Sequence, residues 1–526
     1  MSASVAVGEA ALNRLRTASV DEAISNAMTP VADFISGIIF YSVKIGDPTS
    51  ITAGSTDYFE FPVIVVWLVA AALFFTIYLK FQNITGVKHA VDLVRGKYSQ
   101  PSDAGEVSHF QALTTAISGT VGLGNIAGVA VAVSIGGPGA TFWMIVVGFL
   151  SMSTKMAECT LGVKYRVERA DGSVSGGPMY YLRDGLASLG KRRLGRVLAV
   201  LFALFCIGGA LGGGNMFQAN QATSQIINVT GGEDGPLGAW RFVIGLVFAL
   251  GVGAVIIGGI KSIAKVTEKI VPFMAVLYVI GCLAVIFTNF TAIPDAIGQI
   301  FIGAFNPDGI AGGVIGVLIQ GFQRAAFSNE AGVGSASIAH SAVKTKEPAT
   351  EGFVSLLEPF IDTVVICTMT ALAIVITGTW RDTSSAAGVE TTSAAFATVA
   401  SWFPLLLAVA VVLFAFSTMI SWSYYGMKAT GYLFKDSPRA ELGFKMVFCL
   451  FTVIGATLSL GPVIAFSDSM IFAMAIPNVI GLYLMARVIK REIFGYRARV
   501  RSDEHAMVDQ QGATTDNAGV AQVWSR

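Results

Sequence analysis

Residues 117–127 read ISGTVGLGNIA, and this stretch decides how the chain around it can fold. Two glycines, Gly122 and Gly124, and the polar Asn125 interrupt an otherwise apolar run that is long enough to cross a bilayer. Glycine weakens a helix by about 1 kcal/mol relative to alanine, so two close together favour unwinding. Unwound backbone is tolerated at membrane depth only where it is buried in protein or lines a cavity. The stretch therefore predicts a broken membrane helix.

The composition also indicates a chain that is solvated mainly by lipid. Of 526 residues, 54% are hydrophobic and only 13% are charged, whereas globular proteins carry about a quarter charged residues. The net charge is +1, and Lys and Arg are spread between apolar segments, so we expect no nucleic-acid partner. The five cysteines stand singly in apolar stretches and are expected to be small packing residues.

Windows of about 20 apolar residues predict eleven transmembrane helices in an all-α protein. The windows are 61–80, 112–132, 139–163, 198–226, 241–260, 270–289, 310–341, 353–378, 399–425, 443–460 and 464–488. Residues 30–43 are too short to cross and are expected to form an amphipathic helix on the membrane surface. The tail beyond residue 500 is polar and without periodicity, so we expect it to be largely disordered.

The distribution of Lys and Arg predicts the orientation. If residues 81–111 face the cytoplasm, 27 of the 35 Lys and Arg residues lie on that side, five lie on the other and three lie within the windows. Positive residues collect on the cytoplasmic side of membrane proteins. We therefore expect the N-terminus outside and the C-terminus inside, in the inner membrane of a bacterium or archaeon.

A second interruption matches the first. After the first window, ten remain, and they divide into groups of five at 112–289 and 310–488. The leading window of each group holds a Gly-x-Gly, within GTVGLGN at 119–125 and NEAGVGS at 329–335. Five is odd, so two such repeats have opposite orientations, as in many secondary transporters. The predicted organisation is 1–60 extracytoplasmic segment, 61–111 extra helix and cytoplasmic loop, 112–289 first repeat, 310–488 second repeat, 489–526 cytoplasmic tail.

Two other classes of protein fit less well. The sequence TVGLG differs by one residue from TVGYG of potassium channels, but a filter needs four copies around one axis and this chain has one. A channel would also leave the second break unexplained. No metal motif and no nucleophile–histidine pairing is present, and neither Gly-x-Gly continues into a nucleotide-binding loop. We therefore expect neither an enzyme nor an organic cofactor.

The first break offers groups for both a cation and an anion. The carbonyl ends of one helix half attract a cation, and the amide ends of the other attract an anion. The amides of residues 122–124 suit a carboxylate, because no bulky side chain blocks its approach. The carbonyls of Ser118, Thr120 and Val121, with the side chain of Asn125, suit a hard cation such as sodium. An amino acid zwitterion satisfies both kinds of partner.

Other polar residues within the windows have two interpretations. Asn215 and Gln218 share a helix face, where they either bond neighbouring helices or contact the substrate. Ser417 and Thr418 either complete a cation shell or bond their own helix carbonyls. Trp422, one turn further on, either walls the pocket or packs.

Charged residues within membrane spans need partners. The spacing of Lys155 and Glu158 predicts an internal ion pair. Glu358 and Asp362, four residues apart, are candidate cation ligands or proton sites. Two more charged residues flank the second break and are candidates to brace or gate it: Arg324 and Glu330.

Seven stretches carry a resemblance to a known family. They are GTVGLGNIAGVAVAVSIGGPGATFWM (119–144), TKMAE (154–158), GGPMYYL (176–182), GNMFQAN (214–220), IKSIAKVTEKIVPFMAVLY (260–278), FSNEAGVGSASIAH (327–340) and LFAFSTMISWSYYG (413–426). Through them the chain resembles the alanine/glycine:cation symporter family over roughly residues 60–490. The resemblance implies a LeuT-like 5+5 inverted repeat with one extra leading helix, and sodium-coupled uptake of alanine or glycine.

The same resemblance implies roles for particular residues. The carbonyls of Ser118 and Val121, with Ser417 and Thr418, form one sodium site, and Ser417 replaces one of the two threonines common in relatives. A second sodium site is formed by Thr120, Asn125 and Ser328. Near the substrate the resemblance implies Gln218 and Trp422. Together with the groups of the two breaks, the expected substrate-binding residues are Thr120, Gly122, Leu123, Gly124, Gln218, Gly332 and Trp422.

The leading hypothesis is therefore an amino-acid symporter whose partners are its small substrate, co-transported sodium and membrane lipid. Proton coupling and amino-acid exchange remain alternatives, with an ion channel as a remote one. The dependence of uptake on sodium separates these alternatives.

Overall fold

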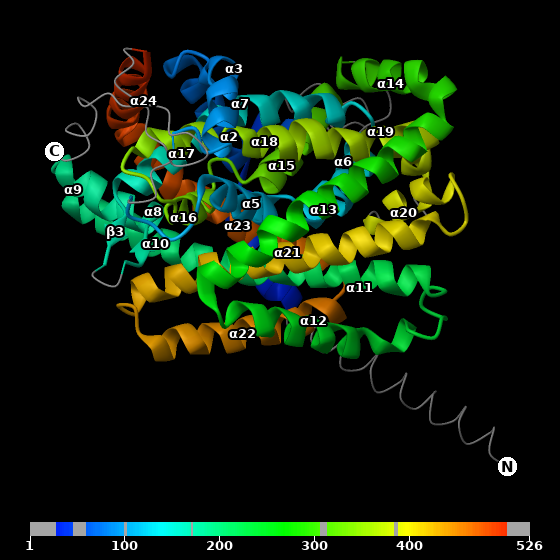
Figure 1. Cartoon of the computed structure of the whole chain (residues 1–526). Coiled ribbons are helices and arrows are strands. Elements are labelled where there is room, and N and C mark those ends of the chain that lie inside the picture. Colours follow the sequence, from blue (N-terminus) through cyan, green and yellow to red (C-terminus); the bar gives the residue numbers. More distant parts are fainter. Residues whose placement is uncertain are drawn as a thin grey trace.

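Most of the chain is helical in the computed structural model, which describes residues 28–45, 59–98, 103–169, 172–305, 313–382 and 388–501 (Figure 1). The tail predicted to be disordered lies outside these residues, as does much of the segment 1–60. The short apolar helix Met28–Ile39 overlaps most of the expected surface helix at 30–43. Two small antiparallel sheets pair β1 (Ser42–Ile45) with β2 (Phe59–Pro62), and β3 (Val167–Glu168) with β4 (Val174–Ser175).

The remaining α-helices follow in chain order. They are α2 (Val63–Tyr78), α3 (Gln82–Thr85), α4 (Val87–Val94), α5 (His109–Thr120), α6 (Ala127–Gly136), α7 (Ala140–Lys164), α8 (Pro178–Tyr180), α9 (Leu186–Ser188), α10 (Arg192–Leu211), α11 (Phe217–Val229), α12 (Arg241–Ile256), α13 (Gly259–Thr288), α14 (Ile293–Phe305), α15 (Gly313–Asn329), α16 (Ala336–His340), α17 (Pro348–Val354), α18 (Leu357–Pro359), α19 (Thr368–Thr377), α20 (Val389–Ala397), α21 (Phe403–Leu433), α22 (Pro438–Thr457), α23 (Leu460–Leu484) and α24 (Ala486–Arg501). Tighter or wider turns, 3-10 or π-helical, form η1 (Leu123–Asn125), η2 (Tyr181–Gly185), η3 (Gly212–Met216), η4 (Gly238–Trp240), η5 (Phe290–Ala292), η6 (Phe360–Cys367) and η7 (Thr379–Arg381).

Eight helices of the described residues are long and apolar enough to cross a membrane, and the bent pair of α5 and η1–α6 makes nine. By length and composition, the structure therefore has fewer spanning helices than the eleven predicted. At two of the predicted windows the reason is the length of the helix. Helix α2 has only 16 residues, and α15 has 17 because it ends at the second break, whereas a span needs about 20. Helices α14 and α20 lie outside the eleven predicted windows, and α24 overlaps the last window only at residues 486–488.

Both predicted breaks are present. Helix α5 begins at a capping box, where Ser108 and Gln111 exchange side-chain and backbone hydrogen bonds, and it ends at Thr120. After the break the chain turns by 55° into η1 and α6. The second break separates α15 from α16, and its glycines, Gly332 and Gly334, have φ values of +89° and +94°. Side chains with a Cβ rarely adopt such angles, which explains why glycine occupies both positions.

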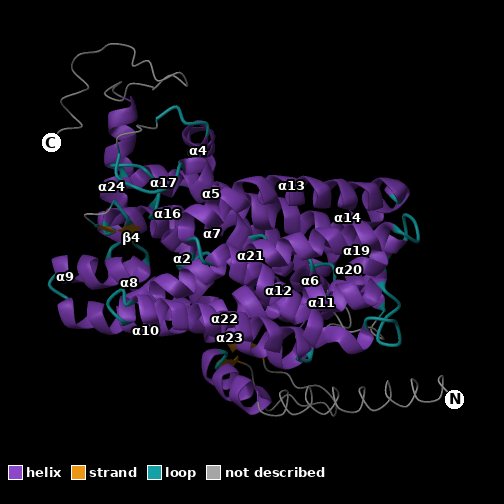
Figure 2. Cartoon of the chain, turned by 60° about the horizontal axis from the view of Figure 1, so that its bottom comes forward, coloured by secondary structure: helices purple, strands orange, loops and turns teal. Residues whose placement is uncertain are grey.

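The first break lies inside the bundle. Residues 112–133 are all buried, and η1 packs against α11, α15, α21 and η6. Helices α12 and α22 lie side by side at the periphery (Figures 1 and 2). Both views place α9, α17 and α24 at one end of the bundle and α14, α19 and α20 at the other.

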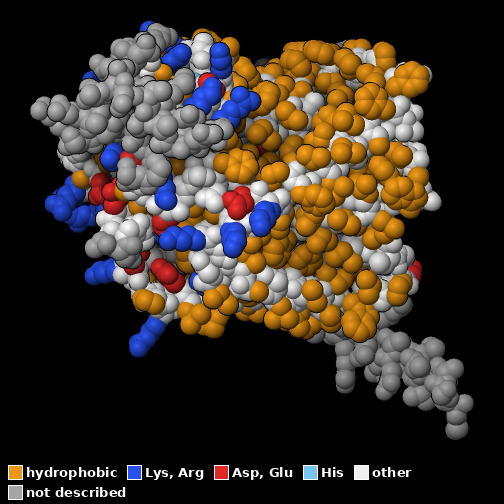
Figure 3. Space-filling model, viewed as in Figure 1, with side chains coloured by type: hydrophobic (Ala, Val, Ile, Leu, Met, Phe, Trp, Pro, Cys, Tyr) orange, Lys and Arg blue, Asp and Glu red, His pale blue; other side chains and the backbone are white. Residues whose placement is uncertain are grey.

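The outer surface suits a lipid environment. Large hydrophobic side chains are exposed along α12, α13 and α14, among them Val247, Phe273 and Phe301. Figure 3 shows this hydrophobic surface over one part of the molecule, while Lys and Arg gather toward the end that carries α9 and α24. Exposed apolar side chains are stable where lipid is the solvent, and charged ones collect where helices leave it.

Candidate functional site

The unwound turn of the first break is held by side chains. The amide of Gly122 donates to Oδ1 of Asn125 at 2.9 Å, and the amide of Leu123 donates to Oε1 of Gln218 at 2.9 Å. Gln218 in turn donates from Nε2 to the carbonyl of Gly213, in the π-helical segment η3. Two amides that the sequence assigns to a substrate carboxylate are therefore bonded to amide oxygens of the protein.

Asn215 and Gln218 take different roles. Asn215 donates to the carbonyl of Phe448 at 2.6 Å and accepts from the hydroxyl of Thr452 at 2.8 Å, so it bonds the neighbouring helix α22. Gln218 reaches the first break instead. Asn215 therefore follows the first interpretation left open by the sequence, whereas Gln218 bonds the unwound turn of the first break.

Helix α21 passes directly beside the break. The hydroxyl of Ser118 donates to the carbonyl of Ser417 at 2.7 Å, whereas the Ser417 hydroxyl donates to its own helix at Phe414. Thr418 is buried, and its hydroxyl has no hydrogen-bond partner among the described residues. A Cβ on Gly122 would lie only 2.5 Å from that hydroxyl oxygen. The structure therefore brings Ser118, Gly122, Ser417 and Thr418 together.

Trp422 and Glu330 connect the two breaks. The indole Nε1–H of Trp422 lies 3.0 Å from Oε1 of Glu330, in the second break, and 3.2 Å from the carbonyl oxygen of Gly119, in α5. The other carboxylate oxygen of Glu330 accepts from the Ser335 hydroxyl. The second break is thus bonded to the first through a side chain of α21.

Asp362 makes a second connection. Its Oδ1 accepts from Nδ2 of Asn125 at 2.7 Å, and its Oδ2 accepts from the hydroxyl of Ser328 at 2.8 Å. Asn125 follows the first break, and Ser328 directly precedes the second. The resemblance pairs Asn125 with Ser328 but omits Asp362, which only the spacing from Glu358 singled out.

The other proposed site residues have local partners. The Thr120 hydroxyl bonds carbonyls of its own helix, at Ala116 and Ile117, and Val121 donates its amide to Ile117. A Cβ placed on Gly124 would lie 3.4 Å from the ring of Phe327, which is an ordinary contact distance.

Gly332 contacts other residues than those that hold the unwound turn of the first break. Its carbonyl accepts from Nδ2 of Asn478 at 2.9 Å, and a Cβ on it would meet Leu68 of α2 at 2.4 Å. The positive φ and this close approach account for the glycine without a ligand. We therefore leave Gly332 out of the substrate site.

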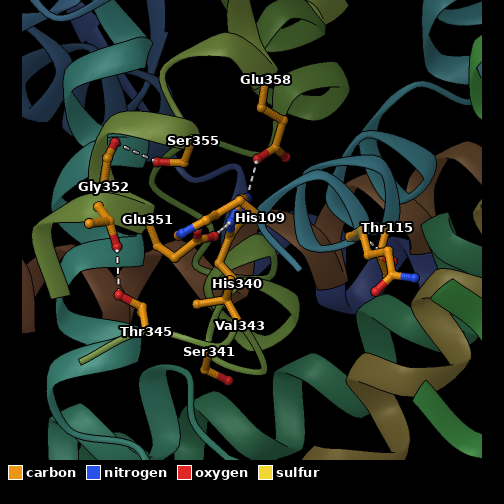
Figure 4. A network of polar contacts seen from close by, with 12 residues as sticks. His109, Thr115, His340, Ser341, Val343, Thr345, Glu351, Gly352, Ser355 and Glu358 are labelled. Atoms are coloured by element: carbon orange, nitrogen blue, oxygen red, sulfur yellow. Dashed lines mark hydrogen bonds and ion pairs between the residues drawn. The ribbon is translucent and has the colours of Figure 1, made fainter. Parts of the chain in front are cut away.

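A network of buried charges lies beside the breaks (Figure 4). The carboxylate of Glu351 bonds Nδ1 of His109 with one oxygen and Nδ1 of His340 with the other. Glu358 lies 3.5 Å from Nε2 of His340 and 3.1 Å from Nζ of Lys155. The network links the start of α5 with α16, which follows the second break.

The expected pair of Lys155 with Glu158 is wrong. Lys155 pairs with Glu358 across the helix interface, and Glu158 accepts instead from Nδ2 of Asn478 at 2.6 Å. Arg324 is likewise paired away from the second break, with Asp468 of α23 at 2.5 Å. In each case the partner comes from a helix distant in sequence.

The donor atoms around the first break suit a hard cation. In the described residues no group of three or more His, Cys, Asp and Glu side chains could hold a metal ion. Carbonyl, hydroxyl and carboxylate oxygens are present there instead, and these are the ligands of alkali and alkaline-earth cations. The five cysteines are free; four are buried and Cys449 is half-buried.

Comparisons with known proteins agree with this chemistry. Residues 49–510 match the model of the sodium:alanine symporter family. The chain is 41% identical to the sodium/alanine symporter AgcS of Methanococcus maripaludis, over 84% of this chain and 96% of AgcS. It is 34% identical to the probable sodium/glutamine symporter GlnT of Bacillus subtilis, over 81% and 86% of the two chains. It is also 32% identical to the putative sodium/proton-dependent alanine carrier protein YrbD of that organism, over 87% and 94%.

Proposed function

This chain belongs to the sodium:alanine symporter family, and we propose that it imports alanine and glycine together with sodium by alternating access. The family and the relatives above are transporters rather than enzymes, and the chain is a multi-pass membrane protein. The observation that carries the proposal is the convergence of both breaks on Asp362 and Trp422. A site shared by two interrupted helices can bind differently as the helices rearrange, which alternating access requires.

We assign the substrate to the first break, at Thr120, Gly122, Leu123, Gly124, Gln218 and Trp422. The substrate carboxylate takes the place of the Gln218 oxygen at the amide of Leu123, and Gln218 turns to the substrate. The ammonium group of the substrate faces carbonyl oxygens of α5 and the carboxylate of Glu330. Burial of both charges is favourable only because each meets several opposed dipoles or charges.

Tight packing around this turn favours a small substrate side chain. A Cβ on Gly213 would lie 2.3 Å from Ile471, and one on Gly214 would lie 2.2 Å from Trp422. Phe217 and Phe327 meet edge to face at 5.5 Å beside Gly124. Alanine and glycine fit such surroundings better than glutamine, the substrate in the name of one relative.

We assign sodium to two places. One is formed by the carbonyls of Ser118 and Val121 with Ser417 and Thr418, and is supported by the buried, unpartnered hydroxyl of Thr418. The other includes Thr120, Asn125 and Ser328. Cation sites beside the substrate provide the coupling, because a nearby positive charge favours the substrate carboxylate.

We further propose that the ten predicted spans after the first, in 112–289 and 310–488, form a LeuT-like 5+5 inverted repeat, with the N-terminus outside and the C-terminus inside. The matched breaks support the repeat, and the gathering of Lys and Arg at one end of the helices supports the orientation (Figure 3). The membrane is the inner membrane of a bacterium or archaeon.

The test is uptake of radiolabelled alanine into proteoliposomes. We expect an inward sodium gradient to drive accumulation, a potassium gradient not to, and unlabelled glycine to compete better than glutamine. Thr418→Val should raise the half-saturating sodium concentration at least about tenfold. Loss of a residue that only hydrogen-bonds a metal ligand already lowers metal affinity by about this factor, and Thr418 is proposed as a ligand itself. Thr430→Val is the matched control, because that hydroxyl bonds its own helix further along α21. Accumulation driven equally well without sodium would overturn the proposal.

A further inference from the structure

Two lysines from distant parts of the sequence share one aromatic ring. Nζ of Lys80, just after the end of α2, lies 5.7 Å from the centre of the Phe494 ring, and Nζ of Lys490 lies 6.0 Å from the same centre. Lys490 also lies over the ring of Tyr78, at 4.4 Å. A cation is attracted to the face of an aromatic ring. These four residues, Tyr78, Lys80, Lys490 and Phe494, form what we call the α2–α24 junction.

No carboxylate neutralises the two lysines of this junction. In the part of the chain that the structure describes, neither lysine has an Asp or Glu oxygen within 4.0 Å. Helix α2 and residues 79–86 contain no acidic residue. The one acidic residue of α24, Glu492, is paired with Lys164, and Asp92 of α4 is paired with Lys97. The junction therefore carries positive charge that these carboxylates do not balance.

The backbone on both sides of the junction is fixed by other side chains. Arg497 of α24 donates to Oε1 of Gln82 at 2.5 Å and to the hydroxyl of Thr85 at 3.0 Å. The hydroxyl of Tyr496 lies 2.8 Å from Nε2 of His89, in α4. These bonds tie α24 to α3 and α4, which lie at the same end of the bundle (Figure 1). The two lysines are thus held near each other without bonding to each other's helix.

The turn that presents Lys80 has an uncommon conformation. Lys80 and Phe81 both have a φ of +55°, at which the Cβ of an ordinary residue crowds the backbone. Their amides donate to the carbonyls of Ile77 and Thr76, so the turn ends α2. Both side chains point outward and are exposed. Backbone strain of this kind occurs often at ligand-binding positions.

An aromatic seam runs from the junction along α2 and α23. Phe74 stacks on Tyr78 at 5.1 Å and meets Tyr483 edge to face at 5.0 Å. Trp67, further along α2, meets the same tyrosine at 5.3 Å. Beside this seam Ile77 is 64% exposed. The seam therefore offers an apolar surface that leads directly to two cations.

We propose that the α2–α24 junction binds the headgroup phosphate of an anionic phospholipid, with an acyl chain along the aromatic seam. Lysine is a common phosphate ligand, and its flexible stem lets both ammonium groups turn to one phosphate. Lysines that follow a membrane helix attract anionic lipid, and tyrosine rings favour the depth of the headgroups. Arg487 and Arg491, both exposed on α24, add positive charge nearby. The site requires no particular substrate or coupling ion.

Binding is measured on the full-length protein in detergent micelles, as the rise of the melting temperature when dioleoyl phosphatidylglycerol is added. A ligand that binds only the folded protein raises this temperature. Phosphatidylethanolamine with the same acyl chains should raise it less, because its own ammonium group repels the lysines. Glycerol 3-phosphate, which has the phosphate but no acyl chain, should leave it unchanged. An equal rise with glycerol 3-phosphate would show a site for free phosphate and overturn the lipid site.

The decisive variant is Lys80→Gln/Lys490→Gln. We expect it to raise the half-saturating mole fraction of phosphatidylglycerol at least about tenfold, since each lysine near anionic lipid contributes a factor of about five. Lys80→Gln and Lys490→Gln alone should each raise it severalfold, and they keep the test valid if the double variant does not fold.

The matched control is Lys261→Gln/Lys265→Gln, which removes the same charge from two exposed lysines of α13. It should change the half-saturating mole fraction by less than about twofold. An equal change in the control would show unspecific attraction between lipid and protein, and would overturn the proposal. So would an unchanged value in the lysine variants of the junction, or a wild-type melting temperature that phosphatidylglycerol does not raise.

Discussion

Trp422 donates its indole N–H to the carboxylate of Glu330 at 3.0 Å, and the same N–H lies 3.2 Å from the carbonyl oxygen of Gly119. Glu330 has a φ of +55°, which is uncommon for a residue other than glycine. The hydrogen bonds from Trp422 and Ser335 hold its side chain in this turn. The second break is therefore kept in shape by α21 as well as by its own glycines.

Replacing Trp422 with phenylalanine tests this relationship. Phenylalanine keeps an aromatic ring but lacks the pyrrole ring of the indole, so a small cavity forms and the carboxylate of Glu330 loses a donor; a hydrogen bond to a charged group contributes about 1.5–3 kcal/mol. We expect a lower melting temperature in detergent and reduced alanine uptake. Trp402→Phe is the control, because Trp402 is 59% exposed. Equal melting temperatures of the two variants would show that the bond does not hold the break.

Gly122→Ala tests the close approach of α21 to the first break. The new Cβ would lie 2.5 Å from the Thr418 hydroxyl and 3.0 Å from Oε1 of Gln218. Overpacking of this kind costs about 1–3 kcal/mol, so we expect uptake to fall sharply. Gly128→Ala is the control in the following helix, since nothing lies within 4 Å of its Cβ. Alanine uptake by Gly122→Ala at the wild-type rate would contradict the site.

The breaks were predictable because they depend on local chemistry. Glycine pairs and polar residues within apolar windows weaken a helix wherever it lies, and the chain is interrupted at 121–122 and 330–335 as expected. For Gly332, the same reasoning allows two uses of the glycine. A glycine in a break can serve the turn through its positive φ, and the sequence does not distinguish that use from contact with a ligand.

Tertiary partners were not predictable from spacing. The i, i+3 rule places Lys155 and Glu158 on one face of α7, but it does not say which residues lie opposite, and Glu358 offers the closer carboxylate. For Asp362, the spacing marked a candidate cation ligand. Its donors, Asn125 and Ser328, are distant in sequence and are brought to it only by the packing of η1, α15 and η6.

Lys155→Met tests the buried charge network of Figure 4. The substitution removes the lysine partner of Glu358, and breaking a buried pair costs about 3–5 kcal/mol. We expect a large fall in the melting temperature, partly restored in Lys155→Met/Glu358→Gln. Lys97→Met removes a more exposed pair with Asp92, where the loss should be at most about 1 kcal/mol. A double variant no more stable than Lys155→Met would contradict this account of the pair.

The proposed orientation predicts which ends of one long helix are accessible from each side of the membrane. The span Arg192–Val229 has 38 residues, a length of about 57 Å at 1.5 Å per residue. This exceeds the thickness of a bilayer with its headgroups, about 40–45 Å, so positions beyond its two ends lie on opposite sides. Arg193 and Asp234 are both exposed and lie near these ends.

We therefore expect a cysteine at Arg193 to react with a membrane-impermeant maleimide only in inside-out vesicles. A cysteine at Asp234 should react only in right-side-out vesicles. The wild type is the control, since four of its five cysteines are buried and the fifth, Cys449, is half-buried in α22. The reverse pattern would place the end rich in Lys and Arg outside. Because positive residues resist translocation, that result would overturn the proposed orientation.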